Sequence, residues 1–467
     1  MLNLNKPILQ LSRHEQSILH SSGPQDFRSL LSGTCRVARL SRSYSDHHRQ
    51  VIWDTSTDVI GPTFFFFIWW TLRCAQQQNI KRLYFLARDG HILIQIAQKI
   101  IEKYNIPIEC RYLHGSRQAW LIPSIRSIDR SELSWIFSDW WYKLSVESVC
   151  KRLSFTPSQA KDVLVQYGFD EHSWDKPLNK EGENKLKDCF KSHLFGDWFQ
   201  SKIITDFNNI TGYFKQEGVW EACPFGLVDI GWLGNQQYTF NKILDKCNHL
   251  PHQSIKGFYL GITEAVKKYP KDQLFGFLFD LSRSRKRISL RNNHLYEVFA
   301  ACDQRRTAHF DSKDGKFFPV FSPLVPKKVI DWGIALQQEG ILEFCSMMIA
   351  NCPSDLFKEE YYYPALEKIL NQFINKPSSG EAQIYGQFPI DGEMTESNLG
   401  QIAPRISRKQ FWTACLNLKE FRLFWIQAVF VRSGLWFEFY FWKVILPLLA
   451  LGYYLLFRLI RLFKKSV

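Results

Sequence analysis

Two segments of the chain share one order of hydrophobic and polar positions. In the first, the apolar run 82–87 is followed by Arg-Asp-Gly, and 91–105 carries apolar residues at helical spacing before a second strand-like run, 108–117. In the second, FGLVDIGWLGN (225–235) is followed by a helical pattern and by the strand-like run IKGFYLGIT. Each order predicts a strand, a tight turn, an amphipathic helix and another strand, which together make a βαβ unit.

Two βαβ units predict an α/β fold with a Rossmann-like, mainly parallel sheet that has helices on both faces. The other segments are expected to be largely helical. In chain order, the expected units are a polar N-terminal lead-in (1–50), the first half of the α/β domain (51–129), a helical insert (130–222), the second half of the α/β domain (223–325), a helical region (326–430) and a membrane-associating C-terminal helix (431–467).

Local patterns add to this outline. Residues 1–50 are predicted to be loosely ordered, with one helix. The aromatic run within 58–78 follows an Asp and a Gly-Pro pair and is too short to span a bilayer, so it predicts a buried core helix. Strand signals are mixed over 275–325, including SRSRKRISLR and HLYEVFAAC, and 376–387 is expected to be a polar loop.

The C-terminal segment combines apolar, aromatic and basic residues. Its apolar run, 444–457, is shorter than the roughly 20 residues that span a bilayer, and aromatic residues precede it. The basic residues after it are Arg458, Arg461, Lys464 and Lys465. The pattern predicts an interfacial or anchoring helix at the inner face of an anionic cytoplasmic membrane. The alternative is a buried terminal helix.

Composition limits the partners of the chain. Its 467 residues suggest two or three domains, and a formal net charge of +14 favours phosphates or acidic lipid as partners. Nucleic acid is not expected, because the sequence has no zinc-finger spacing, RNA-binding aromatic motif or clear helix-turn-helix. Eleven cysteines without a CxxC pair, and an N-terminus without a long apolar segment, indicate reduced thiols in a cytoplasmic chain. The oligomeric state stays open.

The turn Arg88-Asp89-Gly90 is the first candidate site. A charged pair at the end of a buried strand lies in the crevice where open α/β sheets bind ligands. Gly90 permits a sharp turn or a close approach to a ligand, and the helix that follows offers free N–H groups to an anion. Asp89 is a candidate Mg²⁺ ligand or base, and Arg88 a candidate phosphate ligand. In the structural alternative, Asp89 caps the helix and Arg88 forms a surface ion pair.

The second candidate site is the turn after the strand at 225–229. Here Asp229 precedes Gly231, Trp232 and Gly234. Because both turns are expected at one edge of the sheet, Asp89 and Asp229 are predicted to converge on one Mg²⁺ ion or one sugar. Trp232 either stacks on a sugar or base ring or serves as a core anchor.

Further residues extend this candidate site. Arg117, after the strand-like run that begins at 108, is a candidate phosphate ligand on the same edge, and Glu297 is a candidate third acid. Arg285, in the basic cluster 282–287, either clamps a phosphorylated donor or anionic lipid or belongs to a solvated loop. The sequence contains no GxxxxGK[ST], GxSxG or HExxH motif, so the mechanisms tied to those motifs are not assigned.

The succession DVIGP, LYFLARDG, YLHGSRQAW, LVDIGWLGN, GFYLG and YEVFAA resembles a large bacterial domain of poorly defined activity. That domain often forms the C-terminal part of proteins classed as haloacid dehalogenase (HAD) superfamily hydrolases, encoded with capsule, O-antigen and other surface-polysaccharide genes. The resemblance covers about residues 55–325. Residues 1–50 are too few for the HAD part, to which the hydrolase label belongs, so the resemblance implies a role in polysaccharide assembly.

The favoured hypothesis is a transferase that acts on a phosphorylated or nucleotide-activated sugar in surface-polysaccharide biosynthesis. Asp89, Asp229 and Glu297 would carry the chemistry, with Mg²⁺ as the cofactor. A phosphoribosyltransferase-like or HAD-associated hydrolase activity is one alternative. The other is a non-enzymatic, membrane-attached scaffold of a polysaccharide-synthesis complex.

Overall fold

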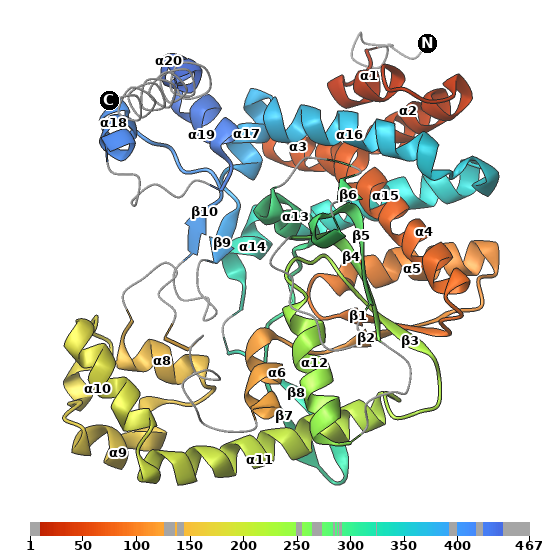
Figure 1. Ribbon diagram of the computed structural model, residues 1–467. Coiled ribbons are helices and arrows are strands. Elements are labelled where there is room, and N and C mark those ends of the chain that lie inside the picture. The colour runs from red at the N-terminus through yellow and green to blue at the C-terminus, as the bar shows by residue number, and fades with distance from the viewer. Residues whose placement is uncertain are drawn as a thin grey trace, which may run out of the picture.

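The computed structural model describes residues 10–125, 136–137, 144–248, 255–263, 273–283, 285–286, 288, 292–323, 325–391, 399–416 and 424–441 (Figure 1). Its central sheet has the strand order β2-β1-β3-β4-β5-β6, with the first five strands parallel and β6 antiparallel to β5. The strands are β1 (Arg82–Leu86), β2 (Glu109–Leu113), β3 (Phe225–Asp229), β4 (Lys256–Ile262), β5 (Gln273–Asp280) and β6 (Arg285–Lys286). The predicted α/β fold is therefore confirmed.

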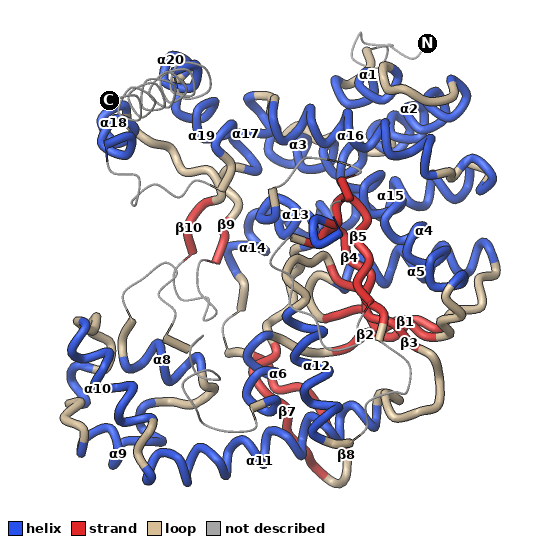
Figure 2. The backbone as a smooth tube through the Cα atoms, in the orientation of Figure 1, coloured by secondary structure: helices blue, strands red, loops and turns tan. Residues whose placement is uncertain are grey.

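Helices cover both faces of the sheet (Figure 2). On β1, Leu83 and Phe85 join one hydrophobic cluster, whereas Tyr84 and Leu86 join another, because side chains alternate between two buried faces. The first cluster includes side chains of α4 (Gly61–Gln77), α5 (Gly90–Tyr104), α13 (Asn293–Ala300), α15 (Ile334–Asn351) and α16 (Glu359–Asn375). The second includes side chains of α6 (Arg117–Ser124), α11 (His193–Gln216) and α12 (Asn235–Lys246).

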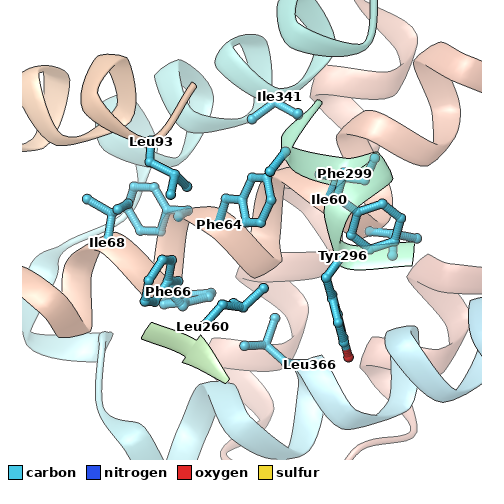
Figure 3. Close-up of a cluster of buried hydrophobic side chains, with 14 of the residues drawn as sticks. Ile60, Phe64, Phe66, Ile68, Leu93, Leu260, Tyr296, Phe299, Ile341 and Leu366 are labelled. Carbon is cyan, nitrogen blue, oxygen red and sulfur yellow. The ribbon is translucent and has the colours of Figure 1, made fainter. Parts of the chain in front are cut away.

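Helix α4 is the centre of the larger hydrophobic cluster. Its consecutive residues Phe64, Phe65, Phe66 and Phe67 are all fully buried, and Figure 3 shows Phe64 and Phe66 among side chains of α5, α13 and α15. A helix that is apolar on every side is buried on every side. The prediction of a core helix within 58–78 is thus confirmed.

The helical insert has a small hydrophobic core of its own. This core contains side chains of α8 (Val146–Arg152), α9 (Lys161–Gln166), α10 (Lys180–Phe190) and the first half of α11, where Phe195 and Phe199 lie. The second half of α11 packs on the sheet through Ile210 and Phe214. One long helix therefore joins the insert to the α/β core (Figure 1).

The N-terminal residues are more ordered than the sequence pattern predicts. They form α1 (Arg13–Leu19), α2 (Gln25–Leu40) and α3 (His47–Thr55), which continues into a π-helical turn, Ser56–Ile60. On α2, Phe27, Leu31 and Cys35 are spaced four residues apart and fully buried. The expectation of a loosely ordered lead-in is wrong, because this narrow apolar stripe suffices to bury one face of a helix.

Two further local predictions are wrong. The segment HLYEVFA forms helix α13, and not a strand, because Leu295, Val298 and Phe299 all turn into the large core. The expected polar loop 376–387 contains α17 (Ser379–Tyr385), whose first turn is closed by reciprocal hydrogen bonds of Ser378 and Glu381. The S-x-x-E spacing is a helix-start signal that the polar composition obscures.

The C-terminal region is helical, as predicted, with small added sheets. The hairpin β7 (Thr307–Lys313) and β8 (Lys316–Phe321) precedes α14 (Lys327–Trp332), and β9 (Pro389–Asp391) pairs with β10 (Leu399–Gln401). Helices α18 (Arg408–Leu416), α19 (Ile426–Ser433) and α20 (Trp436–Tyr440) follow. The predicted apolar run 444–457 and its basic tail lie outside the described residues. Among the described helices, none combines the length and hydropathy needed to cross a membrane.

A buried ionic cluster attaches α1 and α2 to the π-helical turn. The Arg39 Nε donates to Glu15 Oε1 at 2.7 Å and lies 3.8 Å from Asp58 Oδ2, and the Ser12 hydroxyl donates to Asp58 at 2.5 Å. Burial, reinforced by the charge of Glu15, raises the pKa of Asp58 well above its usual range. The raised pKa favours the neutral form of Asp58, whereas Arg39 is the cation that pairs with Glu15.

This cluster predicts unequal effects of two substitutions. Asp58→Asn replaces a neutral carboxyl by a neutral amide, so we expect a change of less than about 1 kcal/mol in the apparent free energy of unfolding. Arg39→Met leaves a buried carboxylate without its cation and should cost about 3–5 kcal/mol. Urea denaturation at neutral pH measures both. Equal losses in the two variants would show that Asp58 is ionised in the folded chain.

Candidate functional site

Asp89 lies in the turn that follows β1. The preceding residue, Arg88, has a φ of +72°, which is unusual for a residue other than glycine, and its backbone N–H donates to the Tyr112 hydroxyl at 2.7 Å. Asp89 occupies the N-cap position of α5, but its side chain accepts no capping hydrogen bond. Asp89 thus has the position that the structural alternative expects, but its partly buried side chain does not form the capping hydrogen bond.

Gly90 brings the start of α5 against the end of β1. A Cβ atom at this position would lie 2.9 Å from the backbone carbonyl carbon of Phe85. A larger residue would push the helix away from the strand, because a backbone atom cannot move aside as a flexible side chain does. The glycine thus permits the sharp turn that the sequence predicts.

Asp229 is the last residue of β3 and lies close to Asp89. Strands β1 and β3 are parallel neighbours, with Phe85 opposite Val228. The side chain of Asp229 accepts the Ile230 N–H at 2.9 Å, and the residue is 7% exposed. Burial raises the pKa of both acids: that of Asp229 to about 7, and that of Asp89 well above its usual range with added repulsion from Asp229. Two carboxyls placed in this way resist simultaneous ionisation.

Glu297, on α13, is the third acid of the group. Its Oε1 accepts the Trp232 indole N–H at 2.9 Å, and its Oε2 lies 3.4 Å from His294 Nδ1. Burial raises the pKa of Glu297. Its contacts with His294 and Trp232 and the charge of Arg117 lower the pKa by more than burial raises it, so the net pKa lies below the usual value. Glu297 is therefore the member of the group that ionises most readily.

Trp232 is a structural anchor in this site. The residue is 8% exposed, and its ring stacks on Phe279 at a centroid distance of 5.9 Å and lies 5.8 Å from the ring of Tyr296. The buried indole is not presented to a sugar or base ring, so of the two predicted roles the structure favours the core anchor. Its N–H still serves the site, because it holds the Glu297 carboxylate.

The two glycines of the second turn shape its backbone. Gly231 has a φ of +139°, and a Cβ there would lie 2.4 Å from the Gly261 carbonyl oxygen on β4. Gly234 has a φ of +69° and is the N-cap residue of α12. The first glycine lets the chain pass directly over the neighbouring strand, where any side chain would collide.

Two of the three predicted arginines lie with the acids. Arg117 is the exposed first residue of α6, and its charge lowers the pKa values of Asp89, Asp229 and Glu297. Arg88 lowers the pKa of Asp89. Arg285 belongs to β6, where its backbone pairs with Asp280, and its side chain lies outside the described residues.

A hydrogen-bonded chain that the sequence does not reveal supports the first turn. The Arg88 N–H donates to the Tyr112 hydroxyl, which donates to Gln304 Oε1 at 2.6 Å, and the Gln304 amide donates to His91 Nδ1 at 2.8 Å. The amide of Gln95 lies 3.3 Å from the other ring nitrogen, Nε2. Burial lowers the pKa of His91. The position of His91 directly after Arg-Asp-Gly was the only signal for this chain in the sequence.

The acids converge at the place where strand order reverses. In the order 2-1-3-4-5, the helices that follow β1 and β3 lie on opposite faces of the sheet. In many α/β proteins, the crevice between the carboxyl ends of two such strands binds ligands. One carboxyl with a pKa near 7 beside an ionised acid suits proton transfer at neutral pH. Within the described part of the chain, no group of three or more His, Cys, Asp or Glu side chains is arranged to hold a metal ion.

Comparison with known proteins adds no relative. The chain matches no family model, and no curated protein matches it in sequence.

The raised pKa of Asp229 predicts a pH-dependent gain in stability on substitution. The folded chain binds this proton more tightly than the unfolded chain, so the stability that protonation contributes is complete at low pH and is lost as the pH rises through 7. Asp229→Asn should therefore raise the apparent free energy of unfolding at pH 8 by roughly 2–4 kcal/mol, and by progressively less as the pH falls toward 4. Thermal denaturation across this range tests it. A difference that does not change with pH would contradict the pKa assignment.

The chain through Tyr112 predicts the cost of losing one hydroxyl. Tyr112→Phe leaves the Arg88 N–H and Gln304 Oε1 without this partner, so we expect a loss of about 1–2 kcal/mol in the apparent free energy of unfolding. Tyr361→Phe is the control, because the Tyr361 ring packs on Phe27 in the helical layer. Urea denaturation compares the two. Equal effects would mean that the Tyr112 hydroxyl contributes nothing specific to this turn.

Proposed function

We propose that the chain is an enzyme of surface-polysaccharide biosynthesis that transfers a sugar from a phosphorylated or nucleotide-activated donor. The observation that carries this proposal is the convergence of Asp89, Asp229 and Glu297, with Arg88 and Arg117 beside them, at the β1–β3 crevice. The resemblance of the short motifs to a domain of polysaccharide loci supplies the pathway.

The arginines and acids divide the work in this proposal. Arg117 is exposed at the start of α6 and binds the donor phosphate, with Arg88 as its neighbour. Asp229 is the base: it accepts the proton of the acceptor hydroxyl, whose oxygen bonds to the anomeric carbon of the sugar. The bond from that carbon to the phosphate oxygen breaks, and the electron pair leaves with the phosphate, where the guanidinium groups offset the charge.

The proposal includes a divalent cation beside the two aspartates. Mg²⁺ commonly binds through one or two carboxylates together with substrate phosphates and water, so it does not require a cage of three acids. Asp89 and Asp229 would hold it, and their mutual repulsion would fall in its presence. When bound, the ion would supply positive charge to the phosphate.

Ligand-induced stabilisation of the full chain tests this function. Nucleotide sugars, sugar phosphates and phosphoribosyl pyrophosphate are added with and without Mg²⁺. A true donor at a hundred times its dissociation constant should stabilise the fold by about 2.7 kcal/mol. We expect this shift to disappear in Asp89→Asn and in Arg117→Gln, whose substitutions remove an acid and a phosphate ligand.

Asp206→Asn is the matched control for the acid. Asp206 is also buried, but it lies on α11, where it pairs with Lys202 at 2.9 Å. This variant should keep the full ligand shift. A donor shift that survives in both site variants would place the binding elsewhere, and no shift with any member of the panel would favour a scaffold over an enzyme.

A further inference from the structure

The last described helix, α20, presents aromatic side chains to the solvent. Trp436, Phe437 and Tyr440 are 63%, 62% and 57% exposed. Trp412 of α18 extends this surface, because it is exposed and its ring lies 4.9 Å from that of Phe441. These four exposed residues, Trp412, Trp436, Phe437 and Tyr440, are termed the aromatic surface.

The helices that carry the aromatic surface are packed against each other. Phe411 and Phe439 both pack on the buried Phe430, at centroid distances of 5.6 and 5.1 Å. Arg408 of α18 pairs with the buried Glu438 of α20 at 3.0 Å. The exposed rings are therefore not the result of a helix that lacks packing, since α20 buries its other side against α18 and α19 (Figure 1).

Basic residues adjoin the aromatic surface along the chain. Arg405, Arg408 and Lys409 are exposed at the start of α18. In the sequence, residues 439–467 contain five lysines and arginines and no aspartate or glutamate. Aromatic rings among basic residues match the boundary of an anionic bilayer, where rings occupy the headgroup level and cations meet lipid phosphates.

We propose that the aromatic surface docks on an anionic lipid bilayer and seats α18 and α20 at its headgroups. The proposal deepens the proposed function by naming its membrane contact, and it does not depend on the chemistry of the acids. A second copy of the chain is the less suitable occupant, because two copies would bring the same basic residues together around the rings.

Vesicle binding of the full chain tests the proposal. Vesicles of phosphatidylcholine are compared with vesicles that also contain phosphatidylglycerol. We expect the wild-type chain to bind the anionic vesicles. The triple variant Trp436→Gln, Phe437→Gln, Tyr440→Gln, termed the aromatic variant, should bind them at least about tenfold more weakly. The matched control replaces Val165, Leu194 and Ile204 by glutamine. These apolar residues of the insert are 49%, 56% and 51% exposed, and their loss should leave binding unchanged.

Hydrogen exchange gives a second readout that needs no substitution. Peptides that cover 408–416 and 436–441 should gain protection on anionic vesicles, and those of the insert should not. Wild-type binding retained in the aromatic variant, or no added protection in these peptides, would overturn the proposal. The proposal would also be overturned if light scattering showed that the wild-type chain is a dimer and the aromatic variant a monomer.

The test separates this inference from the proposed enzyme function. The aromatic variant should keep the donor-induced thermal shift, and Asp89→Asn should keep vesicle binding. Absence of any donor-induced shift in the wild-type chain would remove only the enzyme function. Unchanged vesicle binding by the aromatic variant would remove only the membrane surface.

Discussion

The parallel pairing of β1 with β3 is the constraint on which the candidate site depends. These strands are far apart in the sequence, yet their register places Phe85 beside Val228. Because the two strands are parallel, the backbone leaves both of them at the same edge of the sheet. Parallel strands bury both faces, so helices must follow each strand and return over the sheet. The turns that begin those helices meet where the strand order reverses. Asp89 and Asp229 are neighbours for this reason.

One segment then fixes both turns relative to each other. Glu297 on α13 holds the Trp232 indole of the second turn, and Gln304, in the loop after the same helix, joins Tyr112 and His91 around the first. Helix α13 is itself held at its end by Gln337 of α15, whose amide donates to two of its carbonyl groups. The burial that raises the pKa values of Asp89 and Asp229 thus depends on contacts made by α13 and the loop that follows it.

The sequence predicts the parts of this arrangement that repeat a local period. Apolar runs followed by helical spacing located β1, α5, β3 and α12, and the end of each strand located the candidate acids. The order of the N-terminal helices was underestimated because the buried stripe of α2 is narrow, and α13 was missed because its residues also suit a strand. The link from Tyr112 through Gln304 to His91 joins three elements that become neighbours only in the folded chain. No periodicity records such a contact, and the same is true of the partner of Trp232.

The net charge of the whole chain and the charge of the candidate site have opposite signs. The chain has a net charge of +14, but the site combines three acids with two arginines, so its formal charge is −1. An anionic sugar phosphate would be repelled by that site if every acid were ionised. A proton on the Asp89–Asp229 pair makes it neutral, and a divalent cation makes it positive. The basic excess of the chain therefore would not by itself attract an anionic ligand to the crevice. Five of its positive charges lie in the sequence segment 439–467, which contains no aspartate or glutamate.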